Sequence, residues 1–114
     1  MYQIYKFNLK MREFLENWRY WAHRVAEASK SVLGPCEVYV FGSIAESEWT
    51  SGSDLDILVI CDQLPRSSKD RAELKALIEE KAGLPLYSPV EIHLVTREEA
   101  KWYWRHIKKS IRIY

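Results

Sequence analysis

Apolar residues in the first third of the chain follow a helical period. From Phe14 to Val32 they recur at spacings of three and four residues, and charged residues stand between them. This pattern predicts one long amphipathic helix that ends at Gly34 and Pro35. We interpret its aromatic stripe as a core-facing surface rather than a ligand site. Residues 1–12 fit both an alternating strand and a turn of helix, so the pattern leaves their structure open.

Three shorter apolar runs have the composition of buried strands. The first, Cys36–Phe41, is rich in β-branched and aromatic residues and stops at Gly42. The second, Leu55–Cys61, is apolar except at Asp56, which suits a central strand that is covered on both faces. The third is Val90–Val95. Because helical and polar segments separate these runs, the sequence predicts a mixed α+β fold.

Two further helices are predicted from the residues that would cap them. Ser67 and Asp70 form a capping pair for a helix over about Ser68–Ala82, and Thr96 and Glu99 have the spacing of a capping box. We expect the last helix to run from there to about Ser110. It would carry an apolar stripe and, beside it, a basic stripe. The apolar stripe is Ala100, Trp104, Ile107 and Ile111, and the basic stripe is Lys101, Arg105, Lys108 and Arg112. We interpret the basic stripe as a solvated face, and contact with a phosphate-bearing substrate or an acidic partner is the alternative.

Length, charge and cysteine content narrow the class of protein. The 114 residues suffice for one domain, 1–114. Because 17 basic and 16 acidic residues leave a net charge of +1, we expect no general nucleic-acid binding. Two cysteines, Cys36 and Cys61, are too few for a disulfide framework or a zinc knuckle, which favours a cytoplasmic protein. The chain has neither a signal-peptide pattern nor an apolar run near the roughly 18 residues of a membrane span, so we expect no membrane partner.

Acidic residues occur where the predicted strands should be apolar. Asp54 and Asp56 are two residues apart, so on a strand they would point to the same face. At an effective dielectric near 20 their repulsion would be on the order of 2 to 3 kcal/mol, which favours a cation on that face. Glu91 is a third candidate, although by itself it is slightly more typical of a solvated strand end. Oxygen ligands favour Mg²⁺ or Mn²⁺. His93, on the face of Glu91, would border this site, and a structural histidine with satisfied hydrogen bonds is an equally good interpretation.

A Gly-Ser pair follows the first predicted strand. Gly42 and Ser43 would open a helical turn, so that backbone N–H groups and a hydroxyl converge on one point, as in phosphate-binding turns. Glycine also lets a phosphate approach the backbone closely. If Gly42 ends one strand and Asp54 begins the next at one site, these two strands must be antiparallel. The third strand, with Glu91 near its start, would then be parallel to the second.

This arrangement also places the cysteines. Cys36 and Cys61 would meet at the end of the two strands that is remote from the carboxylates. We interpret them as small buried hydrophobic residues, and a cross-strand disulfide is the alternative if the host is a hyperthermophile.

The stretch 41–59 resembles the signature of minimal nucleotidyltransferases in the DNA polymerase β superfamily. It contains Gly42-Ser43 and, ten residues on, Ser53-Asp54-Leu55-Asp56 running into an apolar strand. The resemblance extends to Glu91 as the third acid. It implies a polymerase β-like nucleotidyltransferase fold, in which helices flank a mixed β-sheet of three or more core strands.

The resemblance also implies roles for these residues. Gly42, Ser43 and Ser53 would bind the nucleotide, and Asp54, Asp56 and Glu91 would be catalytic ligands of Mg²⁺ or Mn²⁺. The reaction would be transfer of a nucleoside monophosphate, with AMP from ATP as the expected case, to a hydroxyl acceptor with release of pyrophosphate.

Partners follow from the same resemblance. Minimal nucleotidyltransferases are commonly antitoxins of helical HEPN-type proteins, so we expect such a partner and leave a homo-oligomer open. The family usually has a basic residue and then glycine where this chain has Glu46 and Ser47. An antitoxin that binds its partner without catalysis, or a nucleotide-sensing module, is therefore the alternative function.

Overall fold

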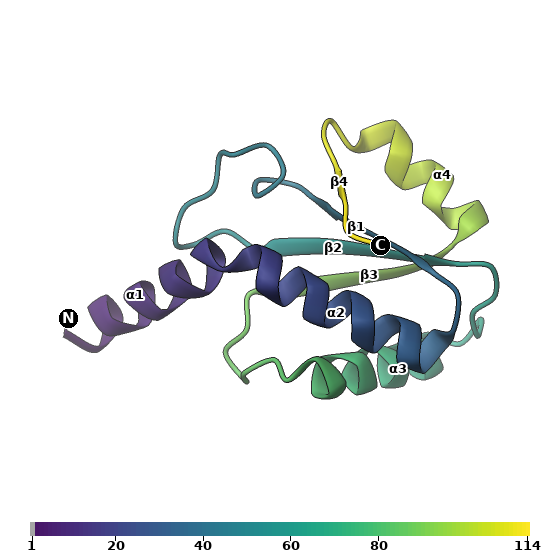
Figure 1. Ribbon diagram of the computed structural model, residues 1–114, viewed down its shortest axis with the longest axis horizontal. Coiled ribbons are helices and arrows are strands. Elements are labelled where there is room, and N and C mark those ends of the chain that lie inside the picture. Colours follow the sequence, from purple (N-terminus) through teal and green to yellow (C-terminus); the bar gives the residue numbers. More distant parts are fainter. Residues whose placement is uncertain (1) are drawn as a thin grey trace.

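The computed structural model describes residues 2–114, in which helices and strands alternate along much of the chain (Figure 1). The helices are α1 (Tyr2–Glu16), α2 (Trp18–Leu33), α3 (Ser68–Ala82) and α4 (Arg97–His106). The strands are β1 (Glu37–Phe41), β2 (Leu55–Cys61), β3 (Val90–Thr96) and β4 (Ile111–Arg112). The predicted α+β fold class is confirmed.

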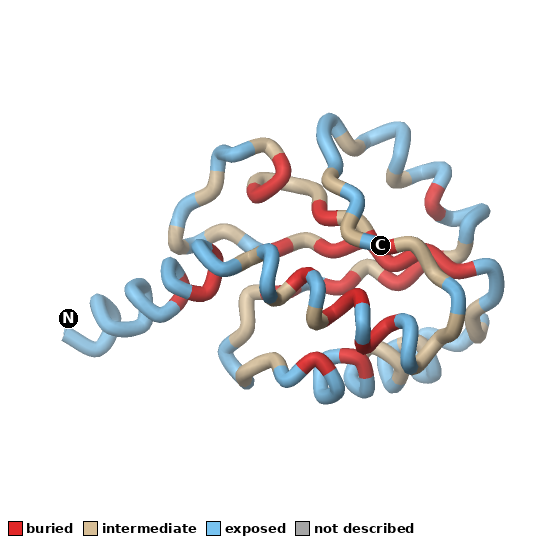
Figure 2. The backbone as a smooth tube through the Cα atoms, in the orientation of Figure 1, coloured by how far each residue is buried: buried red, intermediate tan, exposed pale blue. Residues whose placement is uncertain are grey.

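The strands form one mixed sheet in the order β3-β2-β1-β4. β1 is antiparallel to β2, and β2 is parallel to β3, as predicted. The chain between β2 and β3 crosses over through α3, since parallel neighbours cannot be joined by a tight turn. In β2 every residue except Asp56 is buried, which is the pattern of a central strand (Figure 2).

Helices cover both faces of the sheet (Figure 1). Alternate residues of a strand point to opposite faces. The main core lies between the sheet and α2 and α3, and β2 contributes Leu55, Ile57 and Val59 to it. A smaller cluster lies under α4, where Leu58 and Ile60 of β2 and Val95 of β3 meet Ala100. Because Asp56 alternates in step with Leu58 and Ile60, it lies on the same face as α4.

The first apolar stripe forms two helices rather than the single helix predicted from Phe14. Asn17 separates α1 from α2, because its backbone (φ −101°, ψ 28°) leaves the helical range. Its side-chain amide donates to the carbonyl oxygen of Glu13 at 2.9 Å. The stripe nevertheless faces one core, since the rings of Phe14 and Trp21 stack with centroids 4.6 Å apart across the interruption.

The N-terminal segment that the sequence left open is helical over residues 2–12, and Met1 lies outside the described residues. α1 projects from the body of the molecule, and residues 2–10 are exposed (Figures 1 and 2). Its buried residues are Met11, Phe14 and Leu15, in the last two turns. Exposure of the first turns explains why the apolar pattern there shows no clear period.

The last helix is shorter than predicted. It ends at His106 instead of near Ser110, and β4 then pairs antiparallel with β1. The extended tail is stabilised at this sheet edge by hydrogen bonds such as that from the N–H of Val38 to the carbonyl oxygen of Tyr114, at 2.9 Å. Such pairing satisfies backbone groups of β1 that the edge would otherwise expose. The predicted apolar and basic stripes are therefore wrong as continuous helical faces.

Local capping was predicted correctly. The Ser67 hydroxyl accepts a hydrogen bond from the N–H of Asp70 at 3.3 Å. Thr96 and Glu99 form both hydrogen bonds of the capping box at the start of α4. These caps set where α3 and α4 begin, and α4 in turn sets what covers the second face of the sheet.

The two cysteines lie at the sheet end remote from Gly42, as the strand register requires. Both are free thiols, so the disulfide alternative is not realised. Burial raises the pKa of Cys61 to about 11 and also raises that of Cys36. Within residues 2–114, the helices are too short or too polar to cross a membrane.

Candidate active site

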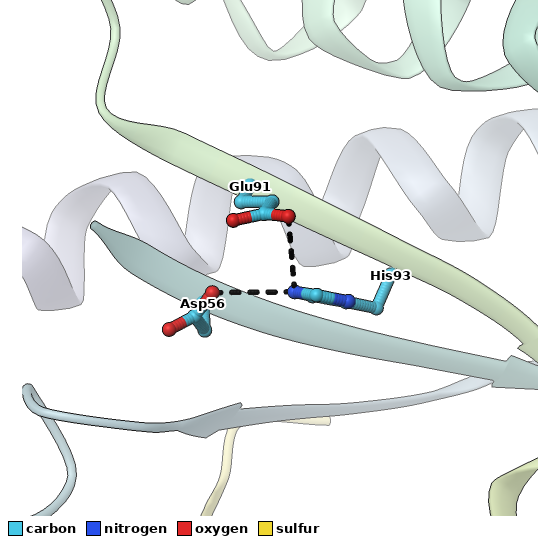
Figure 3. A group of neighbouring side chains, drawn as sticks. All are labelled: Asp56, Glu91 and His93. Atoms are coloured by element: carbon cyan, nitrogen blue, oxygen red, sulfur yellow. Dashed lines mark hydrogen bonds and ion pairs between the residues drawn. The ribbon is translucent and has the colours of Figure 1, made fainter. Parts of the chain in front are cut away.

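Three polar side chains meet on the α4 face of the sheet, at the end near Gly42. The Nε2 atom of His93 lies 3.2 Å from Oδ1 of Asp56 and 3.8 Å from Oε1 of Glu91 (Figure 3). One ligand atom from each residue lies within 4.8 Å of the others. Asp56 and His93 are partly buried and Glu91 is exposed, so the group is open to solvent on one side.

The strand register brings these residues together. β2 and β3 are parallel with Asp56 opposite Glu91 and Leu58 opposite His93. Glu91 and His93 are two residues apart, so both point to the face that Asp56 occupies. The prediction that Glu91 and His93 share a strand face is confirmed, and His93 lies against the Asp56 and Glu91 carboxylates with both ring nitrogens hydrogen-bonded.

His93 is held from its other side by α4. Its Nδ1 atom lies 3.2 Å from the hydroxyl of Tyr103. Burial, and then the nearby Glu91 carboxylate, raise the pKa of Tyr103, so its hydroxyl keeps its proton at neutral pH. The carboxylate oxygen of Asp56 accepts hydrogen bonds, so the tautomer of His93 that donates from Nε2 leaves Nδ1 to accept from the Tyr103 hydroxyl.

Tyr103 was missed by sequence reasoning. α4 and its C-cap residue face the sheet through Ala100, Tyr103 and Ile107, whereas the predicted stripe used Trp104 in place of Tyr103. Spacings of three and four connect Ala100, Tyr103 and Ile107, so the helical period itself contained the signal. A choice between two aromatic residues so close in sequence requires the position of the sheet.

Gly42 packs directly against Asp56. Its φ of +73° is a conformation that L side chains rarely adopt, and a Cβ atom built on it would stand 2.5 Å from Oδ2 of Asp56. Glycine is therefore required here both by the backbone and by the space that the carboxylate occupies. The predicted phosphate turn and the predicted carboxylate thus adjoin each other.

The turn after β1 forms as predicted. Its backbone hydrogen bonds run from the N–H of Glu46 to the carbonyl oxygen of Gly42 (3.1 Å) and from Glu48 to Ser43 (2.9 Å). These bonds use N–H groups from the end of the turn, so the groups at its beginning are the ones suited to an anion. Ser47 takes up the left-handed conformation, with φ of +59°, although it is not glycine.

Two predicted residues are not part of the group of Asp56, Glu91 and His93. Asp54 is exposed and immediately precedes β2, so the argument that it shares a strand face with Asp56 does not apply to it. The Ser53 hydroxyl accepts a hydrogen bond from the N–H of Thr50 at 2.9 Å and so shapes the loop. The ligand roles of both residues stay predictions.

The donor set suits a divalent cation. Carboxylate oxygens of Asp56 and Glu91 are hard ligands of the kind that Mg²⁺ and Mn²⁺ prefer. Both ring nitrogens of His93 already have hydrogen-bond partners, so the two carboxylates are the ligands that this group offers.

Comparisons with known proteins identify the family. The nucleotidyltransferase domain family matches residues 22–114. A crystal structure described as a candidate nucleotidyltransferase is 27% identical with a TM-score of 0.62, over 79% of this chain and 94% of that one. Another, from Sulfolobus solfataricus and described in the same way, is 20% identical with a TM-score of 0.66, over 91% and 86%, and supports the fold alone. Among curated proteins none matches. The chain therefore belongs to the nucleotidyltransferase domain family and has the polymerase β-like fold.

Proposed function

We propose that this nucleotidyltransferase acts in the cytoplasm and transfers AMP from ATP to a hydroxyl group of a protein partner, with Mg²⁺ or Mn²⁺ as cofactor. The observation that carries the proposal is the meeting of the Asp56 and Glu91 carboxylates beside Gly42. Paired carboxylates next to a turn with free N–H groups can hold a cation and a phosphate at one point.

The predicted site residues bind either the cation or the triphosphate. Asp54, Asp56 and Glu91 hold the divalent cation, which when bound neutralises charge on the phosphate oxygens. The turn at Gly42, with the hydroxyls of Ser43 and Ser53, holds the triphosphate.

The acceptor hydroxyl attacks the α-phosphorus while its proton passes to the Glu91 carboxylate. The bond from the α-phosphorus to the pyrophosphate oxygen breaks, and pyrophosphate leaves. His93 is a positioning residue in this scheme, because it links the Asp56 carboxylate to Tyr103.

A protein acceptor is supported by the exposed surface of α1. The side chains of Tyr2, Ile4, Tyr5 and Phe7 are each at least half exposed on this projecting helix. Exposed apolar surface of this kind is typical of protein–protein contact. We propose that the partner is a helical HEPN-type protein and that this chain is its antitoxin.

Binding of the partner without transfer is the second candidate. The half-buried Glu46 lies in the turn that would hold the triphosphate, and a carboxylate there disfavours a second anion. In that case complex formation alone would neutralise the partner.

Transfer can be tested with ATP labelled at the α-phosphate, MgCl₂ and a HEPN-type protein encoded by the same genome. We expect label on the partner, its loss in Asp56→Asn, and its retention in the matched control Glu80→Gln, an exposed carboxylate on α3. Stable complex formation with no label from any nucleoside triphosphate would instead establish the binding function. Absence of both complex and label would refute the proposal.

A further inference from the structure

A cavity of about 420 Å³ lies between α4, the end of β1 and the turn that follows it. Its walls include Phe41, Gly42, His93, Trp102 and Ile107. This volume is within the roughly 300–1,000 Å³ range of small-molecule pockets. The walls are largely aromatic and aliphatic, so the cavity suits a flat, mostly apolar group.

We propose that this cavity binds the base and ribose of the nucleoside triphosphate. The inference rests on the proposed function and deepens it, since it assigns a place to the part of the substrate that the carboxylates and the turn do not hold. Continuity with the active site carries the argument. Gly42 would contact Asp56 if it had a Cβ, His93 is hydrogen-bonded to Asp56, and both residues line the cavity.

The aromatic walls come from different elements. Phe41 at the end of β1 packs edge-on against Tyr103 of α4, with centroids 6.1 Å apart. Trp102 of α4 also lines the cavity, and 54% of its surface remains exposed. Any of the nucleobases can stack on aromatic rings of this kind, because each has a π face. The ring of Trp102 already stacks on that of His106, with centroids 4.3 Å apart, so a base would cover part of the remaining exposed surface of Trp102.

The carboxylate of Glu46 also lines the cavity, as does Lys108. A carboxylate repels phosphate but accepts hydrogen bonds from the exocyclic amino group of a base. Glu46 therefore favours the base end of the ligand, which gives a use to the acid that stands where the family usually has a basic residue. On this basis ATP should bind more tightly than inosine triphosphate, which lacks that amino group.

The structure offers a matched pair of variants for the test. Trp102 lines the cavity, whereas Trp104, on the same helix, packs edge-on against Tyr39 with centroids 4.8 Å apart. Trp102→Ala should therefore weaken base binding, and Trp104→Ala should not. Trp102→Phe keeps an aromatic surface and should restore most of the affinity. Circular dichroism and thermal unfolding show whether each variant is folded.

Binding is measured by isothermal titration calorimetry in MgCl₂, with ATP and with inorganic tripolyphosphate, which has no nucleoside. Trp102→Ala should weaken ATP binding by about tenfold, the range of one base–aromatic stack. Its affinity for tripolyphosphate should not change, and Trp104→Ala should match the wild type for both ligands.

The outcomes distinguish a failure of the cavity proposal from a failure of the proposed function. If tripolyphosphate and ATP bind the wild type equally well, or if Trp102→Ala weakens both alike, the cavity is not the nucleoside site although the phosphate site stands. If neither ligand binds to the folded wild type, the cavity proposal and the transfer proposal both fall.

Discussion

Replacement of Gly42 by alanine tests whether the phosphate turn and Asp56 share one tightly packed space. A Cβ atom on Gly42 would stand 2.5 Å from Oδ2 of Asp56, and the φ of +73° strains any L side chain. We expect Gly42→Ala to lower the free energy of unfolding and to displace the Asp56 carboxylate from its hydrogen bond with His93.

The expected loss in the free energy of unfolding of Gly42→Ala has two contributions. Left-handed backbone costs a residue with a Cβ about 1 kcal/mol, and an extra methyl group forced into packed surroundings costs about 1–3 kcal/mol. The sum of about 2–4 kcal/mol is a large part of the roughly 5–15 kcal/mol that stabilises a domain. Gly83→Ala is the matched control, because its φ is +72° and the nearest atom, Nη2 of Arg24 at 3.1 Å, ends a flexible side chain. The control should lose only about 1 kcal/mol.

Urea denaturation followed by circular dichroism measures these differences. With an m value of about 2 kcal/mol per molar urea, the midpoint should fall by about 1–2 M in Gly42→Ala. In an Asp56→Ala background the carboxylate is gone, so Gly42→Ala should cost no more than the Gly83 control. Equal losses in the Gly42 and Gly83 variants would refute the reasoning, and so would an undiminished loss in the Asp56→Ala background.

Three other predictions concern backbone strain, thiol reactivity and acid stability. Ser47→Gly should raise the free energy of unfolding by about 1 kcal/mol in urea denaturation, because it relieves a φ of +59°; a loss of stability would contradict this. Burial raises the pKa of Cys61 to about 11, so iodoacetamide at pH 8 should label this thiol only in denaturant, as mass spectrometry can show. Hydrogen bonds from Tyr39 and then Arg97 hold the pKa of Glu37 below its usual value, so its stabilisation is complete above about pH 4.3 and is lost as pH falls through the lower, folded value. The difference in Tm between wild type and Glu37→Gln should therefore shrink on acidification, and a difference that grows would show that the linkage has the opposite sign.

Most helices and strands could be predicted because their signals are local. The caps at Ser67 and at Thr96 are satisfied by residues three positions away, so the starts of α3 and α4 depend on nothing distant. β2 was recognisable from a continuous apolar run, and its one polar residue, Asp56, pointed to the site. The turn at Gly42 was predicted from residue type, since its backbone requires glycine.

The errors occur where distant segments compete with local preference. The helical period continues past His106, but Ile111–Arg112 forms a strand that pairs with the edge of β1. Likewise the apolar stripe runs through Asn17 without a break, although the two helices meet there. In both places the periodic pattern indicates which face is apolar. It does not indicate where the backbone must turn to bury that face.

The amino-acid sequence by itself determined the chemistry of this protein: two strand carboxylates, a glycine turn and a histidine on the face of Glu91. Only the tertiary structure decided how they combine. His93 contacts Asp56 from 37 residues away and Tyr103 from 10, and Gly42 leaves the space that the Asp56 carboxylate fills. The physical reason is that residue type and spacing act over one or two turns of chain, whereas contacts across strands and from a covering helix depend on register and packing, which the whole fold sets together.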